Sequence, residues 1–114
     1  MIEKSVAVDD IDAILESAKE KQVDMTQWGP ADFGFSLGRP ELKDTPEIKP
    51  FEKLIIKKSL EYGVRPRIEI GEVEQAKPYI DLGVKDFCIG WDRFILYATF
   101  ARLGEGLRGL VDNL

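Results

Sequence analysis

The stretch "RPRIEIGEVEQAKPYIDLGVKDFCIG", residues 65–90, contains one complete strand, helix, strand unit. Residues 65–70 alternate charged and apolar side chains, which predicts a strand. Residues 72–83 predict a helix that Pro78 kinks, and residues 85–90 predict another strand. Two strands joined by a helix over so short a span indicate a parallel pair with a right-handed crossover.

Upstream of this unit the chain repeats the order of helix and strand. Residues 9–21 carry apolar side chains at helical spacing, with Asp9 available as the cap of the predicted helix. The run 23–28 is apolar enough for a short strand, which Gly29 and Pro30 stop. The apolar face of the predicted helix consists of Ile11, Ile14, Leu15 and Ala18.

A loop and a further helix connect this strand to the opening stretch. Residues 29–46 show no clear periodicity, so we expect a long loop, which in a compact domain is functional or mobile. Residues 47–62 place apolar side chains on one helical face, with Pro50 in the first turn and Gly63 as the C-terminal cap.

The chain ends with the pattern of a long helix over residues 92–114, weakened by three glycines. Its segment 94–100 is apolar around most of the helical circumference, so the helix needs cover on more than one side. One simple source of that cover is a partner chain.

The predicted fold class is α/β, with parallel strands alternating with helices. Residues 1–3, Met-Ile-Glu, fit the end of one more strand, which makes about four strand and helix units in a single domain over residues 1–114. Four such units are half of a (β/α)8 TIM barrel. A half-barrel leaves strand edges uncovered, so we expect a homo-oligomer, with two copies completing a barrel or exchanging the terminal helix.

Composition narrows the class of protein further. Of the 114 residues, 44% are hydrophobic and 32% are charged, as in globular proteins, and the net charge of −5 argues against nucleic acid as a partner. No stretch is long and apolar enough for a membrane span or a signal peptide, so no membrane contact and a cytoplasmic location are the default expectations.

The single cysteine, Cys88, is expected to be a buried thiol. The sequence contains no histidine, which excludes histidine-based catalytic groups supplied by this chain alone.

Two acids fall just after predicted strands. In parallel α/β folds the strand C-terminal ends build the active site, and Glu3 and Asp32 would stand at neighbouring ends. Two carboxylates without histidine or cysteine suit a hard divalent cation, Mg²⁺ or Mn²⁺. The turn at Gly29 and Pro30 would also aim the backbone N–H groups of Ala31 and Asp32 at an anion. By spacing alone, Asp32 fits a turn or helix cap better than a metal ligand.

The exact residues of several motifs indicate a protein family more specifically than the spacing of the acids does. "MIEK", "VDMTQWGPADFGFSLGRP", "AKPYIDLGVKDFCIGWD" and "GEGLRGL" together resemble the C-terminal half of the HpcH/HpaI family of class II aldolases, which includes the 2,4-dihydroxyhept-2-ene-1,7-dioate aldolases. The resemblance runs along essentially the whole sequence. It implies a TIM barrel, carbon-carbon lyase activity with pyruvate as product or nucleophile, and 2-oxo acid substrates.

The resemblance also implies roles for particular residues. Glu3 of "MIEK" and Asp32 of "GPAD" would hold a divalent metal, Mg²⁺ or Mn²⁺ with Co²⁺ as a further candidate, acting as a Lewis acid on pyruvate. Gly29, Pro30 and Ala31 would form the loop that binds the pyruvate carboxylate. The family's catalytic histidine and arginine come from the first half of the barrel, so no residue of this sequence takes a catalytic role.

Other polar and aromatic residues have two interpretations each. Arg65, Arg67 and Glu69 share one face of a strand and either line the barrel interior near a substrate acid or, as we favour, form internal ion pairs between the layers of a barrel. Trp28 and Trp91, at or just beyond strand ends, fit the wall of a pocket as well as simple burial.

Three functional hypotheses follow from the sequence. The first is a metal-dependent aldolase or a portion derived from one. The second is a non-catalytic oligomeric module that binds metal and carboxylate and needs a partner half-barrel. The third is a truncated portion of a longer enzyme, and the sequence does not separate a natural short chain from a truncated one.

Overall fold

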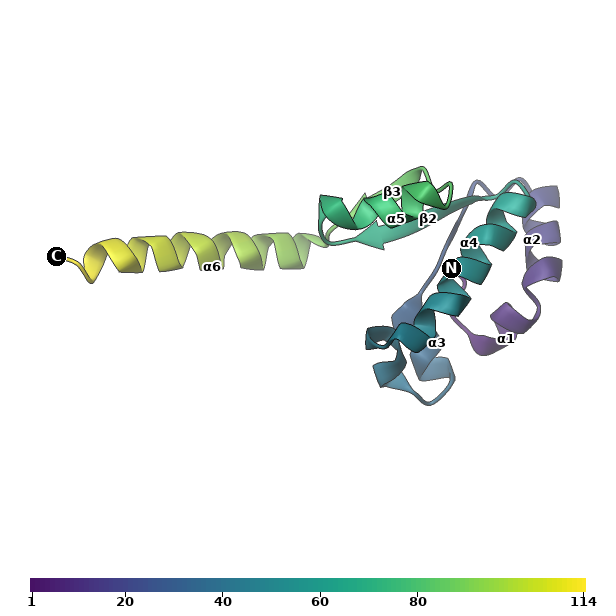
Figure 1. The fold of residues 1–114 in the computed structure, drawn as a ribbon, viewed down its shortest axis with the longest axis horizontal. Coiled ribbons are helices and arrows are strands. Elements are labelled where there is room, and N and C mark those ends of the chain that lie inside the picture. Colours follow the sequence, from purple (N-terminus) through teal and green to yellow (C-terminus); the bar gives the residue numbers. More distant parts are fainter.

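Three parallel strands form the sheet of the computed structural model, which describes residues 1–114. The strands are β1 (Met25–Gln27), β2 (Arg65–Ile70) and β3 (Asp86–Ile89), in the order β1-β2-β3 (Figure 1). Both neighbouring pairs are parallel, with Gln27 opposite Arg67 and Glu69 opposite Cys88. The α/β class and the parallel connections predicted from residues 65–90 are therefore confirmed.

Helices precede, connect and follow these strands. They are α1 (Ser5–Asp9), α2 (Ile11–Glu20), α3 (Pro30–Ser36), α4 (Lys49–Glu61), α5 (Lys77–Asp81) and α6 (Asp92–Val111), with short 3-10 helices η1 (Pro40–Asp44), η2 (Pro46–Ile48) and η3 (Val73–Ala76). As predicted, Pro50 lies in the first turn of α4, and Gly63 follows it with a positive φ of 74°. No helix combines the length and apolarity needed to cross a bilayer.

Residues 1–3 do not form a fourth strand. Ile2 makes an isolated parallel bridge to Trp28, donating its N–H to the carbonyl of Gln27 and accepting the N–H of Gly29. The chain thus begins beside β1, in the direction expected, but the pairing extends over one residue only.

Local details of three predicted segments differ from expectation. Asp9 is the last residue of α1 and caps nothing, because the predicted helix 9–21 is divided at Asp10. The region expected to be a loop, 29–46, forms α3 and η1, each starting at a proline whose fixed φ suits a first turn.

Pro78 was expected to kink a helix, and instead it lies in the first turn of α5. The preceding turn, η3, is a separate 3-10 segment that begins at a capping box formed by Glu72 and Gln75. The proline therefore begins a helix here, because its missing N–H costs nothing in a first turn.

The core lies on one side of the sheet. Its larger cluster joins α1, α2, α3 and α4 around Leu15, Phe33 and Ile55, all of which are essentially inaccessible to solvent. A smaller cluster packs Ile56 of α4 against Ile68 and other apolar residues of the sheet region. Burial of these alternating strand residues fixes which face of the sheet the helices cover.

The other face of the sheet is uncovered. Burial alternates along β2, so Arg65, Arg67 and Glu69 are exposed while the residues between them are buried. Cys88, in register with Glu69, is half-buried and not the fully buried thiol that was expected. In a barrel this face would point into the interior.

Helix α6 projects away from the rest of the chain (Figure 1). The radius of gyration is 18.3 Å and the longest extent 65 Å, against a radius of about 13 Å for a compact domain of this length. Its apolar side chains stay exposed, with Phe100 at 68% and Leu110 at 72%. We predicted that the apolar side chains of this helix need other residues packed against them. Within the chain, almost no residues pack against them.

Candidate functional site

The C-terminal ends of the three strands open onto one cavity of about 820 Å³. A glycine comes at or near each strand end: Gly29 after β1, Gly71 after β2 and Gly90 after β3, and all three line the cavity. The start of α6 forms another side of it. The cavity therefore lies where parallel α/β folds bind their ligands.

Glu3 stands beside this cavity, held by the bridge that Ile2 makes to β1. The hydrogen bonds from Ile2 N–H to Gln27 O, at 2.8 Å, and from Gly29 N–H to Ile2 O, at 2.9 Å, fix the backbone on both sides of Trp28 and place Glu3 beside Gly29. A Cβ at Gly29 would lie 2.8 Å from Cβ and 3.1 Å from Oε2 of Glu3. The close approach of Glu3 therefore requires glycine at this position.

Asp32 lies in the first turn of α3, and its side chain is exposed toward the cavity lining. Gly29 is the N-cap residue of α3, and Pro30 is the first helical residue. Asp32 accepts no capping hydrogen bond that would account for its position, and it has no ion-pair partner in the chain. The alternative of a simple cap, favoured by spacing, gains no support from these contacts.

The residues expected to bind substrate come together at the same place. Gly29, Pro30 and Ala31 all line the cavity together with Asp32. The N–H groups of Ala31 and Asp32, in the first turn of α3, have no acceptor within the helix. Glu3, in contrast, adjoins Gly29 without lining the cavity.

The chemistry of these donors fits a hard divalent cation. Glu3 and Asp32 provide carboxylate oxygens, and neither has a hydrogen-bond or ion-pair partner in the chain. No group of three or more Asp, Glu, Cys or His side chains is arranged to hold a metal ion. A cation held here would therefore take its remaining ligands from water or substrate, as Mg²⁺ commonly does.

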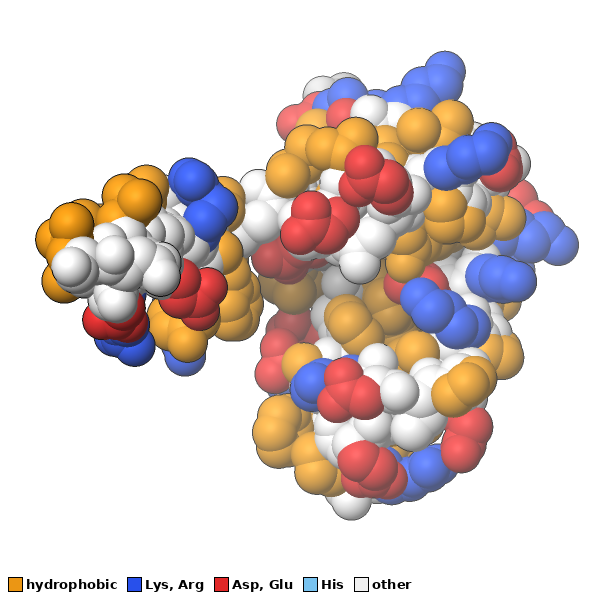
Figure 2. All heavy atoms as spheres, turned by 60° about the vertical axis from the view of Figure 1, so that its left-hand side comes forward, with side chains coloured by type: hydrophobic (Ala, Val, Ile, Leu, Met, Phe, Trp, Pro, Cys, Tyr) orange, Lys and Arg blue, Asp and Glu red, His pale blue; other side chains and the backbone are white.

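Two further acids line the cavity: Glu69, for which the sequence left a place near a substrate open, and Glu72, which it did not assign to the site. Glu69 is on β2, and Glu72 follows Gly71 directly after that strand. The charged side chains of the lining are thus all acidic, namely Asp32, Glu69 and Glu72. Figure 2 shows acidic side chains beside the hollow between the terminal helix and the rest of the chain. An acid directly after a predicted strand was the available signal for Glu72.

The two arginines of β2 are bound to neighbouring strands. Arg65 pairs with Asp86 of β3 at 3.0 Å, and Arg67 donates hydrogen bonds to Oε1 of Gln27 on β1. Gln27 in turn donates to Glu69 at 3.3 Å. This polar ladder favours the interpretation of pairing across strands, and neither arginine lines the cavity.

The two tryptophans have different environments. Trp28 is 5% exposed and packs on Phe33 with ring centroids 4.9 Å apart, so burial explains most of its surface. Its Nε1 is buried without a hydrogen-bond partner. Trp91 is 54% exposed and stacks on Phe94 at the start of α6, where both line the cavity.

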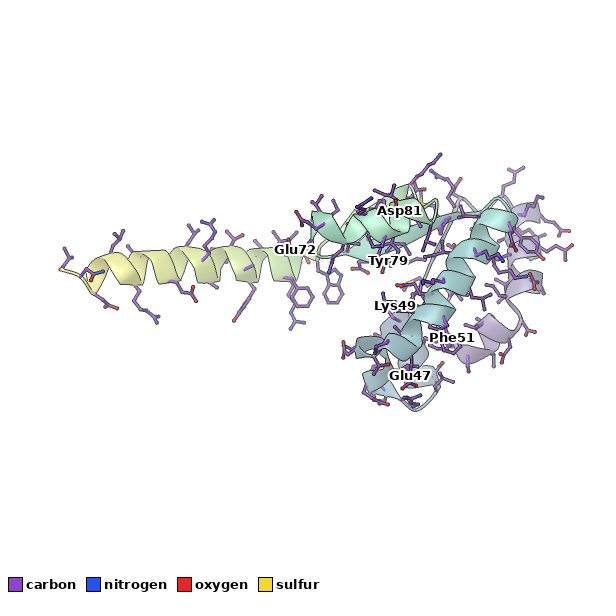
Figure 3. All side chains as sticks on the ribbon, viewed as in Figure 1. Glu47, Lys49, Phe51, Glu72, Tyr79 and Asp81 are labelled. Atoms are coloured by element: carbon purple, nitrogen blue, oxygen red, sulfur yellow. The ribbon has the colours of Figure 1, made fainter.

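A separate polar cluster lies on the helical side of the sheet. The buried carboxylate of Glu52 accepts hydrogen bonds from Lys49 at 2.8 Å and from Tyr79 at 3.0 Å. Figure 3 labels Lys49 on α4 and Tyr79 on α5. Burial raises the pKa of Tyr79, and the charge of Glu52 adds to that increase. Burial alone would lower the pKa of Lys49, but its hydrogen bonds to Glu52 and Tyr79 outweigh burial and raise it. This cluster ties α4 to α5 and has no part in the cavity.

Comparison with known proteins identifies the fold. No protein-family model matches the sequence, and no curated protein matches it significantly. Among solved structures, the chain is similar to citrate synthase SbnG, with a TM-score of 0.86 and 25% identity over 98% of this chain and 44% of that protein.

Two more solved structures show the same likeness. The HpcH/HpaI aldolase from Desulfitobacterium hafniense DCB-2 has a TM-score of 0.80 and 20% identity, over 93% of this chain and 40% of that one. The HpcH/HpaI aldolase/citrate lyase family protein from Burkholderia cenocepacia J2315 has a TM-score of 0.74 and 26% identity, over 91% and 40%.

The resemblance to HpcH/HpaI aldolases seen in the sequence is confirmed by these neighbours. The chain spans less than half the length of each of them. It therefore corresponds to part of such a protein, and the activity of a whole family member does not transfer to it directly.

Proposed function

We propose that this partial HpcH/HpaI aldolase chain carries the metal-binding and 2-oxo-acid-binding half of a divalent-metal-dependent carbon-carbon lyase. In this proposal Glu3 and Asp32 hold Mg²⁺, Mn²⁺ or Co²⁺. Gly29, Pro30 and Ala31 form the loop that receives the carboxylate of pyruvate or another 2-oxo acid. The structural neighbours, an HpcH/HpaI aldolase and an aldolase/citrate lyase family protein among them, support a lyase fold. The divalent metal is what the sequence resemblance to this family implies.

The observation that carries the proposal is that Glu3 packs against Gly29 while Asp32 lies three residues further on, in the first turn of α3. Glu3 packs on Gly29 so closely that no side chain fits there. Asp32 follows at the first turn of α3 and lines the cavity. A structural role alone does not explain two carboxylates without partners at the C-terminal ends of parallel strands.

In this proposal, the residues of this chain bind the metal and the 2-oxo acid, and other residues of a complete barrel contribute to the bond cleavage. A divalent cation polarises the keto oxygen of a 2-oxo acid when it is bound. The unpaired N–H groups of Ala31 and Asp32 would orient the carboxylate of the acid. Cleavage of the bond between C3 and C4 of a 4-hydroxy-2-oxo acid also needs a base for the hydroxyl proton. The family resemblance implies a histidine from the first half of the barrel for this proton transfer, and this chain contains no histidine.

Metal binding tests the proposal directly. The affinity for Mn²⁺, measured by electron paramagnetic resonance with and without pyruvate, should increase when pyruvate is present. The variants Glu3→Gln and Asp32→Asn should each weaken Mn²⁺ binding by at least about tenfold. Glu74→Gln, which removes an exposed acid outside the cavity, is the matched control. Unchanged Mn²⁺ affinity in Asp32→Asn would overturn the ligand assignment.

A second candidate function is a binding module without turnover that assembles with another half-barrel. The uncovered face of the sheet and the exposed apolar surface of α6 favour it. Two copies of this chain, or this chain and a separate first half, would cover both. In this case pyruvate and Mn²⁺ bind, but retro-aldol release of pyruvate stays undetectable until the complementary half is added.

A further inference from the structure

We infer that Ser36 is a positioning residue, whose hydroxyl holds the segment that carries Glu3 against the helix that carries Asp32. The segment consists of residues 2–5 and is called here the Glu3 segment, and the helix is α3. This inference rests on the proposed function, because the attachment matters for a metal only if Glu3 and Asp32 bind one.

One end of the Glu3 segment is fixed to the end of β1. Ile2 donates its N–H to the carbonyl of Gln27 at 2.8 Å and accepts the N–H of Gly29 at 2.9 Å. Gly29 is buried and is the N-cap residue of α3. The segment is therefore attached at the point where α3 begins.

The other end of the Glu3 segment is fixed at the point where α3 ends. The hydroxyl of Ser36, the last residue of α3, accepts the N–H of Ser5 at 3.0 Å and donates to the carbonyl of Phe33 at 2.8 Å. A hydroxyl has one hydrogen to donate and lone pairs to accept, so both bonds can form at once. Ser5 is the first residue of α1, and its N–H has no acceptor within that helix. In Figure 1, the start of α1 lies near α3.

The Glu3 segment has little slack between these two attachments. The seven residues of α3 rise by about 10 Å along the helix axis. The three steps of chain from Ile2 to Ser5 span about 10 Å when fully extended. Lys4, within the segment, is extended, with φ −127° and ψ 147°. The two attachments therefore limit how far Glu3 can shift.

Loss of the Ser36 hydroxyl would release one end of the segment and leave α3 in place. Glu3 would then be held through Ile2 alone. Asp32 would keep its position, because Phe33 beside it is 1% exposed and anchors α3 in the core. A carboxylate with more freedom loses more conformational entropy when it binds a metal, so the affinity for the metal should fall.

The affinity of the full chain for Mn²⁺, measured by electron paramagnetic resonance, tests this positioning. Ser36→Ala removes the hydroxyl of an exposed residue and should weaken Mn²⁺ binding by about threefold to tenfold, the effect of one lost hydrogen bond. Ser36→Thr keeps the hydroxyl and should bind Mn²⁺ like the unmodified chain. Ser17→Ala, at an exposed serine of α2 whose hydroxyl has no partner, is the matched control.

A double variant shows whether Ser36 acts through Glu3. Beside Glu3→Gln, which already lacks the carboxylate, Ser36→Ala should cause no further loss of Mn²⁺ affinity. A general loosening of α3 would act on Asp32 instead and would lower the affinity by a similar factor in both backgrounds. Unchanged Mn²⁺ affinity in Ser36→Ala, or a similar further loss beside Glu3→Gln, overturns the inference.

Amide hydrogen exchange separates this inference from the proposed function, because it needs no metal. Ser36→Ala should speed exchange of the N–H groups of Ser5 and Gly29 severalfold relative to that of Ile55, which is buried in α4 and reports the stability of the whole chain. A rate at Gly29 that changes no more than the rate at Ile55 overturns the inference, even where Mn²⁺ binds as proposed. Faster exchange at Gly29 in a chain that binds no Mn²⁺ overturns the metal site and leaves the attachment of the Glu3 segment standing.

Discussion

Oε2 of Glu3 and the Cα of Gly29 are so close that a methyl group on Gly29 would lie 3.1 Å from that oxygen. The backbone cannot yield easily, because Gly29 N–H is hydrogen-bonded to the carbonyl of Ile2 at 2.9 Å. The side chain of Glu3 must therefore move if Gly29 acquires a side chain.

Gly29→Ala should displace Glu3 and weaken Mn²⁺ binding without removing either carboxylate. Overpacking at this position should also lower the free energy of unfolding by about 1–3 kcal/mol. Mn²⁺ titration and urea unfolding measure the two effects. Gly104→Ala is the control, because a Cβ there meets nothing within 4 Å. Full Mn²⁺ affinity in Gly29→Ala would show that the position of Glu3 is unimportant for the metal.

The buried hydroxyls of Thr26 and Ser59 form a hydrogen bond of 2.8 Å between β1 and α4. Ser59→Ala leaves the hydroxyl of Thr26 unpaired and should lower the free energy of unfolding by about 1–3 kcal/mol. The double variant Thr26→Val with Ser59→Ala removes both groups and should cost less than the sum of the two single changes. Strictly additive losses in urea unfolding would show that the two hydroxyls are not coupled.

The cluster of Lys49, Glu52 and Tyr79 should make stability fall at alkaline pH. The pKa values of Lys49 and Tyr79 are both raised in the folded chain, so folding favours their protonated forms. This contribution is complete below the ordinary pKa values of about 10 and is lost as the pH rises through the folded values. Urea unfolding between pH 7 and pH 11 measures the decline.

Tyr79→Phe tests the same cluster. It removes one donor to the buried carboxylate of Glu52 and should lower the free energy of unfolding at pH 7 by about 1–2 kcal/mol. The decline above pH 10 should become shallower, because one titrating group is gone. Tyr97→Phe, at an exposed hydroxyl without a partner, is the control. An unaltered alkaline decline in Tyr79→Phe would assign that decline to other groups.

Association through α6 should depend on its apolar side chains. Phe100→Glu combined with Leu107→Glu places charges on two exposed apolar positions, each worth about 1.5–3 kcal/mol if buried in an interface. Size-exclusion chromatography with light scattering should show an oligomer for the unmodified chain and a smaller species for this variant. Arg102→Glu changes charge on the same helix and is the control. A compact monomer in the unmodified chain would contradict the expected association.

The sequence predicted the parts of the fold that have strong periodicity. The alternation in residues 65–70 and the long apolar patterns of α4 and α6 are set by which side chains become buried, and pattern reveals this directly. The helices between residues 30 and 48 were missed, because they are short and begin at prolines that sequence patterns treat as loop signals. The split at Asp10 also depends on packing between α1 and α2, which no local pattern encodes.

For the candidate site, Asp32 and Gly29 could be placed from their motif, and their position at a strand end followed from the fold. The sequence left two interpretations for Glu69 and none for Glu72, because the lining of the cavity depends on how the strand ends and the start of α6 come together. The polar ladder from Arg67 through Gln27 likewise depends on strand register, which is fixed only when three strands pair.

Helix α6 carries one more consequence for the protein in solution. Most helical stability in proteins comes from packing of the apolar face, which α6 lacks within the chain, and each of Gly104, Gly106 and Gly109 lowers its intrinsic stability by about 1 kcal/mol relative to alanine. Burial of its apolar side chains against another surface would supply the missing stability. We expect the amide hydrogens of α6 to become better protected from exchange when its apolar side chains are covered, so hydrogen exchange would report how far this helix is covered in solution.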